Sequence, residues 1–208
     1  LDVDGGTIKL DGNYPTGTGN VALGDRALSS GSLSGNFNTA VGFCSLKDNT
    51  SGDRNTASGM NSLCANTTGA CNAAFGRDAL TTNTTGVRNT ALGFGALFAN
   101  TTASNNTAVG KNSMIANTEG HSNVAVGANA LDANTTGDQN VAIGMDALTS
   151  NTTASNNTAV GDEALKLNTT GSENVAMGVA TLDANTTGTK NTAVGVNALT
   201  SNTTAFAN

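Results

Sequence analysis

The chain has 208 residues, of which 26 are glycine, 3% are aromatic and 12% are charged. Typical globular domains carry about 25% charged residues, so we do not expect an ordinary globular core here. Nine basic residues stand against fifteen acidic ones without a basic cluster, which excludes the electrostatic footprint of a nucleic-acid-binding protein. No run of 18 apolar residues occurs, and we therefore expect no insertion into a membrane.

Residues 1–19 differ from the rest of the chain and predict a short β lead-in or cap. Apolar and polar residues alternate over 1–4 and 7–10, as in short strands, and glycine-containing turns separate these segments. Pro15, the one proline, comes just before the first repeat, where its missing N–H would interrupt no hydrogen-bond ladder.

Residues 20–208 are a tandem repeat with a 17-residue period and an 18-residue first copy. An asparagine opens each of the eleven copies, at positions 20, 38, 55, 72, 89, 106, 123, 140, 157, 174 and 191, and Asn208 would open the next. A fixed short period indicates a solenoid or a fibre. We number the positions of a copy from this asparagine and call all residues at one position a column.

Comparison of the copies separates constant columns from variable ones. Column 3 is Ala and column 5 is Gly in all eleven copies, and column 9 is Leu except at Met114. Column 4 is apolar except at Ser58. After the first copy, columns 12 and 13 are Asn-Thr and column 15 is Gly or Ala. The constant alanine marks a place where another surface approaches closely, either inside the coil or from a neighbouring subunit.

These columns predict an all-β fold, a β-solenoid or β-roll of eleven 17-residue coils that forms a shaft over residues 20–208. We expect columns 2 to 4 to form a short strand that the glycine of column 5 ends. The Ala-Leu pair of columns 8 and 9 is predicted to start a second strand. Asn-Thr-Thr-Gly makes the return corner, where Gly takes a positive φ and Asn bonds neighbouring backbone. A helix is excluded because Gly or Asn-Thr interrupts every stretch.

Burial within one chain is predicted to be insufficient for this fold. Each coil offers only two or three sizeable apolar side chains, which cannot offset the conformational entropy lost when the whole coil is ordered. Backbone ladders and further burial must therefore contribute, and we expect an intertwined or side-by-side parallel homotrimer.

Variable columns are the candidates for contact with a partner. Columns 6, 7, 10, 16 and 17 vary freely between copies, and we interpret them as facing the solvent. The aromatic residues Phe43, Phe94 and Phe98 fall in such columns and are the candidate receptor-binding residues. The alternative interpretation is that the shaft only spaces a tip.

No catalytic, metal-binding or cofactor-binding residue set is predicted. The acids Asp146, Asp162 and Glu163 have no histidine or cysteine partner in their copies, so an enzyme is not expected. The odd number of cysteines, at three different repeat positions, predicts free thiols. Acids at Asp25, Asp78, Asp132 and Asp183 are interpreted as solubilising charge, and the single histidine, His121, as a solvated side chain.

The repeat resembles those of known attachment proteins. Residues 140–144, Asn-Val-Ala-Ile-Gly, are similar to the head repeats of YadA-like trimeric adhesins. Residues 123–127 followed by Ala130-Leu131 and by Asn-Thr-Thr-Gly at 134–137 resemble more closely the repeat shafts of bacteriophage tail fibres. The resemblance covers residues 20–208. It implies a parallel homotrimer of β-rolls on a virion or cell surface that works in attachment.

The expected function is therefore that of a structural fibre protein of a phage virion, in a tail fibre or similar appendage, that attaches to the host. Its expected partners are its own copies, other virion or appendage proteins, and a host-surface glycan or protein. One alternative is a trimeric autotransporter-type adhesin head on a bacterial surface. A second is an ice-binding β-solenoid, because ladders such as Thr84-Thr85 above Thr67-Thr68 could order water. The Asn-x-Thr sequons, including Asn66, Asn83 and Asn134, are interpreted as ladder residues.

Overall fold

Columns 2 to 4 of every copy form one three-residue β-strand in the computed structural model, which describes residues 17–208. An alanine lies between two residues that are mostly β-branched or apolar, a composition that suits a strand. The strands are β1 (Val21–Leu23), β2 (Thr39–Val41), β3 (Thr56–Ser58), β4 (Ala73–Phe75), β5 (Thr90–Leu92), β6 (Thr107–Val109), β7 (Val124–Val126), β8 (Val141–Ile143), β9 (Thr158–Val160), β10 (Val175–Met177) and β11 (Thr192–Val194).

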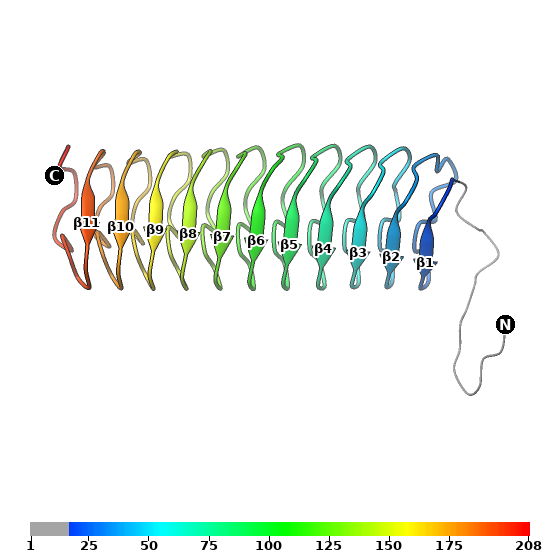
Figure 1. Cartoon of the computed structure of the whole chain (residues 1–208), viewed down its shortest axis with the longest axis horizontal. Coiled ribbons are helices and arrows are strands. Elements are labelled where there is room, and N and C mark those ends of the chain that lie inside the picture. The colour runs from blue at the N-terminus through cyan, green and yellow to red at the C-terminus, as the bar shows by residue number, and fades with distance from the viewer. Residues whose placement is uncertain (1–16) are drawn as a thin grey trace, which may run out of the picture.

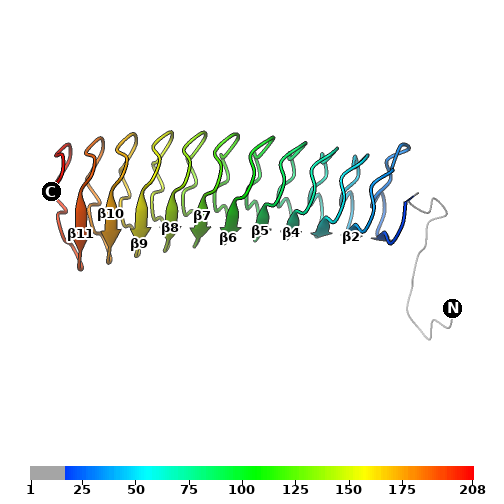
Figure 2. The ribbon, with the colours of Figure 1, turned by 45° about the horizontal axis from the view of Figure 1, so that its top comes forward.

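The eleven strands pair in chain order in one parallel sheet, so that each coil lies directly on the previous one (Figures 1 and 2). Ala57 pairs with Ala74, its counterpart in the next copy, and Ala22 pairs with Ala40 because the first copy is one residue longer. At about 4.8 Å per coil, the stack is a rod roughly 50 Å long. The predicted all-β solenoid of eleven coils is confirmed, and residues 17–208 contain no helix.

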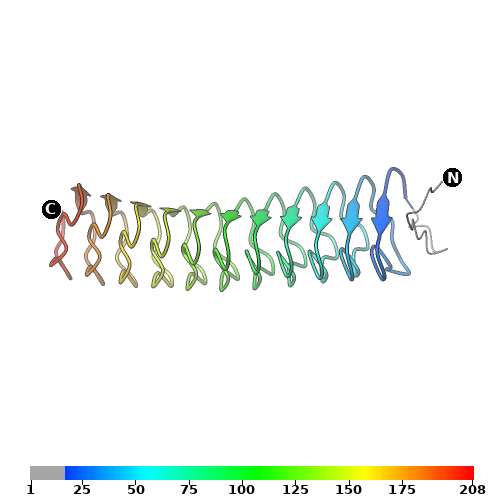
Figure 3. The same ribbon diagram turned by 90° about the horizontal axis from the view of Figure 1, so that it is seen from below.

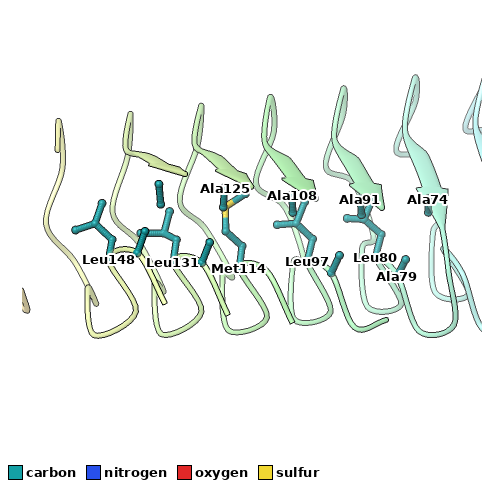
Figure 4. Packing of buried hydrophobic residues seen from close by; sticks show 14 of the residues in the cluster. Ala74, Ala79, Leu80, Ala91, Leu97, Ala108, Met114, Ala125, Leu131 and Leu148 are labelled. Atoms are coloured by element: carbon teal, nitrogen blue, oxygen red, sulfur yellow. The ribbon is translucent and has the colours of Figure 1, made fainter. Parts of the chain in front are cut away.

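A narrow apolar core runs inside the rod behind the sheet. The alanines of column 3, from Ala40 to Ala176, are fully buried, as are the leucines of column 9 from Leu46 to Leu182, with Met114 among them. Figure 4 shows these leucines between the alanines of the strands and those of column 8. The constant alanine of column 3 is therefore small because it packs inside its own coil, and no neighbouring subunit is needed to explain it.

Two buried ladders of asparagine form the other half of the interior. In column 1, Asn123 Oδ1 accepts a hydrogen bond from the backbone N–H of Asn140 at 2.9 Å, and Asn123 Nδ2 donates to Gly137 O at 2.8 Å. In column 12, Asn134 Nδ2 donates to Asn117 Oδ1 at 2.8 Å and to Gly137 O at 3.0 Å. These side chains are fully buried. The predicted bonding of asparagine to neighbouring backbone is confirmed.

The predicted second strand at columns 8 and 9 is wrong, because this segment forms consecutive turns. The N–H of column 8 bonds to the carbonyl of column 5, as from Ser62 to Gly59, and that of column 10 bonds to column 7, as from Cys64 to Asn61. Columns 7 and 9 occupy the third position of such turns, where a positive φ is required in type II geometry. The residues of column 9 accordingly have φ between +46° and +54°. Column 7 is rich in Asn and Asp, which adopt this conformation readily.

The glycine with positive φ is in column 5, not in column 15 as predicted. Column 5 has φ between +121° and +143°, a region open essentially to glycine alone. A Cβ added at Gly127 would lie 2.3 Å from the carbonyl oxygen of Gly144 in the next coil. In column 15 no glycine has a positive φ, and alanine replaces it at Ala103, Ala154 and Ala205.

The N-terminal lead-in predicted for residues 1–19 falls mainly outside the described residues. Residues 17–19 precede β1 and are exposed, while the strands expected over 1–4 and 7–10, the turns between them and Pro15 belong to the residues that are not described. Figure 3 shows how the strands turn gradually along the rod from β1 to β11, as strands of a twisted parallel sheet do.

We predict that Asn123→Ala destabilises the rod far more than Thr136→Ala. The first change leaves the buried backbone N–H of Asn140 without its acceptor, which should cost about 2–3 kcal/mol. Thr136 is exposed, so its truncation should change the free energy of unfolding by less than about 0.5 kcal/mol. Urea unfolding followed by circular dichroism compares the two variants. Equal midpoints would show that the asparagine ladder does not hold the coils together.

We also predict different outcomes for one substitution at two glycines. Gly127→Ala should destabilise the fold by about 3 kcal/mol or more, because both its φ and the approach of Gly144 exclude a Cβ. At Gly137 an added Cβ would also lie 2.3 Å from Ala154 O, but φ is ordinary there and the column holds alanine in other coils. A small backbone shift therefore accommodates Gly137→Ala at a cost of about 1 kcal/mol. Thermal unfolding of both variants is the measurement, and a larger loss at Gly137 than at Gly127 would contradict the turn assignment.

Candidate functional site

The outward side chains of the strands form what we call the sheet face, made of columns 2 and 4. Because column 3 points inward, its neighbours on each strand point to the solvent. The most exposed side chains of column 4 are Leu23, Phe75, Leu92, Val126, Ile143, Met177 and Val194, each at least 36% exposed. The expectation that a coil buries two or three sizeable apolar side chains is therefore wrong. Beyond the first coil, column 9 alone supplies a fully buried large one.

Column 6 borders the sheet face and has a mixed character. It exposes the apolar side chains of Phe43, Met60, Phe94, Met145, Val179 and Val196. Charged residues occupy the same column at Asp25, Arg77, Lys111 and Asp162. Column 6 thus extends the apolar surface of the sheet face in some coils and places a charge beside it in others.

The three candidate receptor-binding residues do not form one cluster. Phe43 and Phe94 both belong to column 6 but are three coils apart, about 14 Å at the spacing of a parallel sheet. Phe98 lies in column 10 of the same coil as Phe94. All three are exposed, at 44%, 45% and 38%, and the guanidinium of Arg77 lies 5.4 Å from the ring centroid of Phe94.

Threonines form two ladders of different character at the return corner. In column 13 each hydroxyl bonds to the next coil, as from Thr67 Oγ1 to Thr84 O at 3.0 Å. Column 14 is exposed in every coil after the first, and none of its hydroxyls has a hydrogen bond within residues 17–208. Ser51 and Glu119 replace threonine there, so the fold does not require this side chain.

Variation between copies tracks exposure only in part. Column 17 varies and is exposed from Arg54 to Ala207, as predicted, whereas columns 10 and 16 are mostly half-buried. Column 7 varies but is also mostly half-buried, with Cys44 and Gly95 buried. Columns 7, 10 and 16 therefore face the solvent only in part, and the prediction of full exposure does not hold for them. Column 14 is nearly constant and exposed. The turn conformation explains column 7, because its side chains stack on one another, as between Asn61 Nδ2 and Asp78 Oδ1 at 2.9 Å.

The sequon asparagines are structural. Asn66 Nδ2 donates to Asn49 Oδ1 at 2.7 Å and to Gly69 O at 2.9 Å, and Asn83 repeats this arrangement one coil later. Asn66, Asn83 and Asn134 are fully buried. Their side chains lie in the ladder of column 12, where the folded rod leaves no room for an attached glycan.

Titratable side chains are dispersed along the rod. Residues 17–208 contain no group of three His, Cys, Asp or Glu residues that could hold a metal ion. Glu163 Oε1 accepts a hydrogen bond from Lys166 Nζ at 2.5 Å, and this contact raises the pKa of Lys166. The exposed His121 accepts a hydrogen bond at Nδ1 from the backbone N–H of Ser104 at 2.9 Å. Asp146 and Asp162 stand in columns 7 and 6, with no histidine or cysteine in their own or the adjoining coils.

The three cysteines are free, as predicted. Cys44 is buried, Cys64 is half-buried and Cys71 is exposed. Burial raises the pKa of the Cys64 thiol, so that the thiol stays protonated and weakly reactive near neutral pH.

Comparison of the chain with protein-family models, with curated proteins and with solved structures finds no match. None of the elements over residues 17–208 is a helix long and apolar enough to cross a membrane. Functional inference therefore rests on the surfaces described above.

We predict that Asp132→Asn stabilises the rod at pH 7 but not at pH 3. Burial raises the pKa of Asp132, against the hydrogen bond that Thr149 Oγ1 donates to Oδ1 at 2.9 Å. A folded-state pKa above the unfolded value of about 3.9 means that ionisation disfavours the folded state, and this penalty disappears as the pH falls below that value. Asparagine keeps an acceptor oxygen without the charge.

Melting temperatures at both pH values test this prediction. Thr149→Val is the control, and it should lower the melting temperature at pH 7 because the ionised carboxylate loses its donor. A variant Asp132→Asn that melts below the natural chain at pH 7 would refute the assignment.

Proposed function

We propose that this chain forms the shaft of an attachment fibre on a bacteriophage virion, assembled as a homotrimer. The observation that carries the proposal is the unbroken stack of eleven coils in one register along one axis. In such a stack the length of the rod grows in proportion to the number of coils, since every coil adds about 4.8 Å. A structural role fits this geometry better than catalysis does.

Hydrogen bonds between coils make the rod suitable for bearing load. Backbone N–H groups of each coil bond to carbonyls of its neighbours at the strand, at the turns and at the return corner, as from Val124 to Asn140, Met114 to Ala130 and Thr135 to Thr152. The asparagine ladders add side-chain bonds in the interior. Bending the rod would strain all of these columns together, so the solenoid should hold a fixed direction.

The repeat sequence favours a location of the chain on a virion over a location on a bacterial surface. The Asn-Thr-Thr-Gly segment, which resembles phage fibre shafts, is the part that builds the buried ladder of column 12. The shorter motif Asn-x-Ala-x-Gly is shared with YadA-like adhesin heads, so an adhesin remains the alternative. Host contact through a glycan or protein would use the exposed columns, with Phe43, Phe94 and Phe98 as candidates.

A second candidate function, ice binding, is favoured by column 14. Its threonines are exposed and evenly spaced, and their hydroxyls make no hydrogen bond within residues 17–208, which are the properties of a surface that orders water. Only one such column is available, because the hydroxyls of column 13 are bonded to the next coil. The ice-binding proposal therefore ranks below the fibre.

The first test is the mass of the purified chain in solution, measured by light scattering. The fibre proposal expects three times the chain mass of 20.5 kDa. A monomer of 20.5 kDa would refute the homotrimer, and inhibition of ice recrystallisation by that monomer would favour the second candidate.

Immunogold electron microscopy then locates the chain. Antibodies raised against residues 17–208 should label the tail or another appendage of virions. Labelling of bacterial cell surfaces instead would overturn the phage assignment in favour of the adhesin.

A further inference from the structure

The sheet face is an uncharged strip that runs the whole length of the rod. In all eleven coils, column 4 contains no charged residue, and neither does column 2, where Thr, Val and Ala alternate irregularly. Column 6, directly beside it, carries four charged residues. The exposed fraction of the strip's apolar side chains reaches 48% at Leu92 and 44% at Met177, inside the stack and away from its ends.

This strip has the dimensions of a functional surface patch. It is roughly 50 Å long and about 10 Å wide, on the order of 500 Å², before column 6 is added. The largest apolar patch on a typical monomer measures about 300–600 Å², and such a patch often serves a function. A stable interface needs about 800 Å² from each partner, which the strip approaches once the apolar members of column 6 contribute. The strip has the properties of an interface.

The period of the strip restricts what can cover it. The strands follow one another one coil at a time and twist slowly along the rod (Figure 3), so the side chains that they carry must do the same. A partner must follow the same spacing and the same twist over eleven coils. Within residues 17–208, the surface that meets this requirement and is itself apolar is the sheet face. A second copy of the chain therefore supplies the matching surface.

We infer that the sheet faces of parallel copies pack against one another at zero coil shift, with column 4 nearest the common axis and column 6 at the margin. This inference rests on the proposed homotrimer and adds the face and register of its contact. In a closed cyclic assembly whose axis follows the rod, all copies are parallel and at equal height. Each residue near the axis then meets its own counterparts.

The distribution of charge fits this register. A charged residue near the axis would face the same charge on the other copies, at close range and out of water, which is strongly unfavourable. Column 4 contains none. The four charged residues stand instead in column 6, at the margin, where Asp25, Arg77 and Lys111 are exposed and Asp162 is half-buried. Column 4 also places its smallest residue, Ser58, directly beside its largest, Phe75, so that the small side chain leaves space next to the large one.

Cysteine crosslinking tests both face and register. In a background of Cys44→Ala, Cys64→Ser and Cys71→Ser, Ser58→Cys places one thiol in column 4 of the third coil. Ser51→Cys makes the same chemical change in exposed column 14 of the second coil and serves as the matched control. Mild oxidation should join Ser58→Cys chains into disulfide-linked pairs on a non-reducing gel, and leave Ser51→Cys chains single. Equal crosslinking of both, or of neither, would overturn the inference.

Coexpression distinguishes parallel from antiparallel packing. Full antiparallel overlap would put the third coil opposite the ninth, so Ser58→Cys would pair with Val160→Cys. The inference expects Ser58→Cys chains to crosslink to one another and not to Val160→Cys chains. Pairs that form only between the two different variants would refute the parallel register.

A charge substitution gives an independent readout. Ile143→Lys should reduce the mass in solution from three chains to one, whereas Thr136→Lys, in column 14, should leave it at three. The side chain of Ile143 points outward, so the coil itself should keep its β circular dichroism. An unchanged mass for Ile143→Lys would contradict the interface.

The outcomes separate this inference from the proposed function. If the antibody labels virions but Ser58→Cys chains do not crosslink, the proposed phage fibre stands and the sheet face is not the contact between copies. If Ser58→Cys chains crosslink but the antibody labels cell surfaces, the sheet face is the contact and the chain does not belong to a phage fibre.

Discussion

The hydrogen bonds of buried asparagine side chains are the interactions on which the rest of this structure depends. Each Asn of column 1 replaces a backbone acceptor for the following coil, as Asn123 Oδ1 does for the N–H of Asn140. Each Asn of column 12 links both to its own corner and to the preceding coil, as Asn134 does. A buried amide without partners would be costly, so each coil is stable only with a similar coil above and below it. This need accounts for the near identity of the copies.

The same arrangement limits the apolar core. Half of the interior is occupied by amides and close-packed backbone, which leaves room for one leucine and two small residues per coil. The remaining apolar side chains of the strands, such as Leu92 and Ile143, must therefore point outward. In the proposed assembly, the sheet faces of associated copies would form a second apolar core that a single chain lacks. Stability and assembly would then have a common physical origin.

The sequence alone predicted the period, the strand in columns 2 to 4 and the laddered asparagines, because stacking imposes the same residue at each level. It did not predict the turn at columns 8 and 9, since Leu at φ near +50° contradicts its usual preference and arises from the two overlapping turns around it. It misplaced the glycine with positive φ, although the occurrence of Ala103 in column 15 was a usable signal. The outward direction of column 4 was also readable, because the strand alternates around a constant inward alanine.

The strict register of the coils has a consequence for how such a chain can change in evolution. Coils contact only their immediate neighbours, and Ala57 pairs with Ala74 in the same way that Ala142 pairs with Ala159. Duplication or loss of one complete 17-residue copy would thus preserve every ladder and merely lengthen or shorten the rod. Insertion of a single residue would usually displace all later columns, yet the 18-residue copy that starts at Asn20 keeps its strand in register with the next one. Recombination between near-identical copies could therefore alter reach in single steps without redesign of the fold.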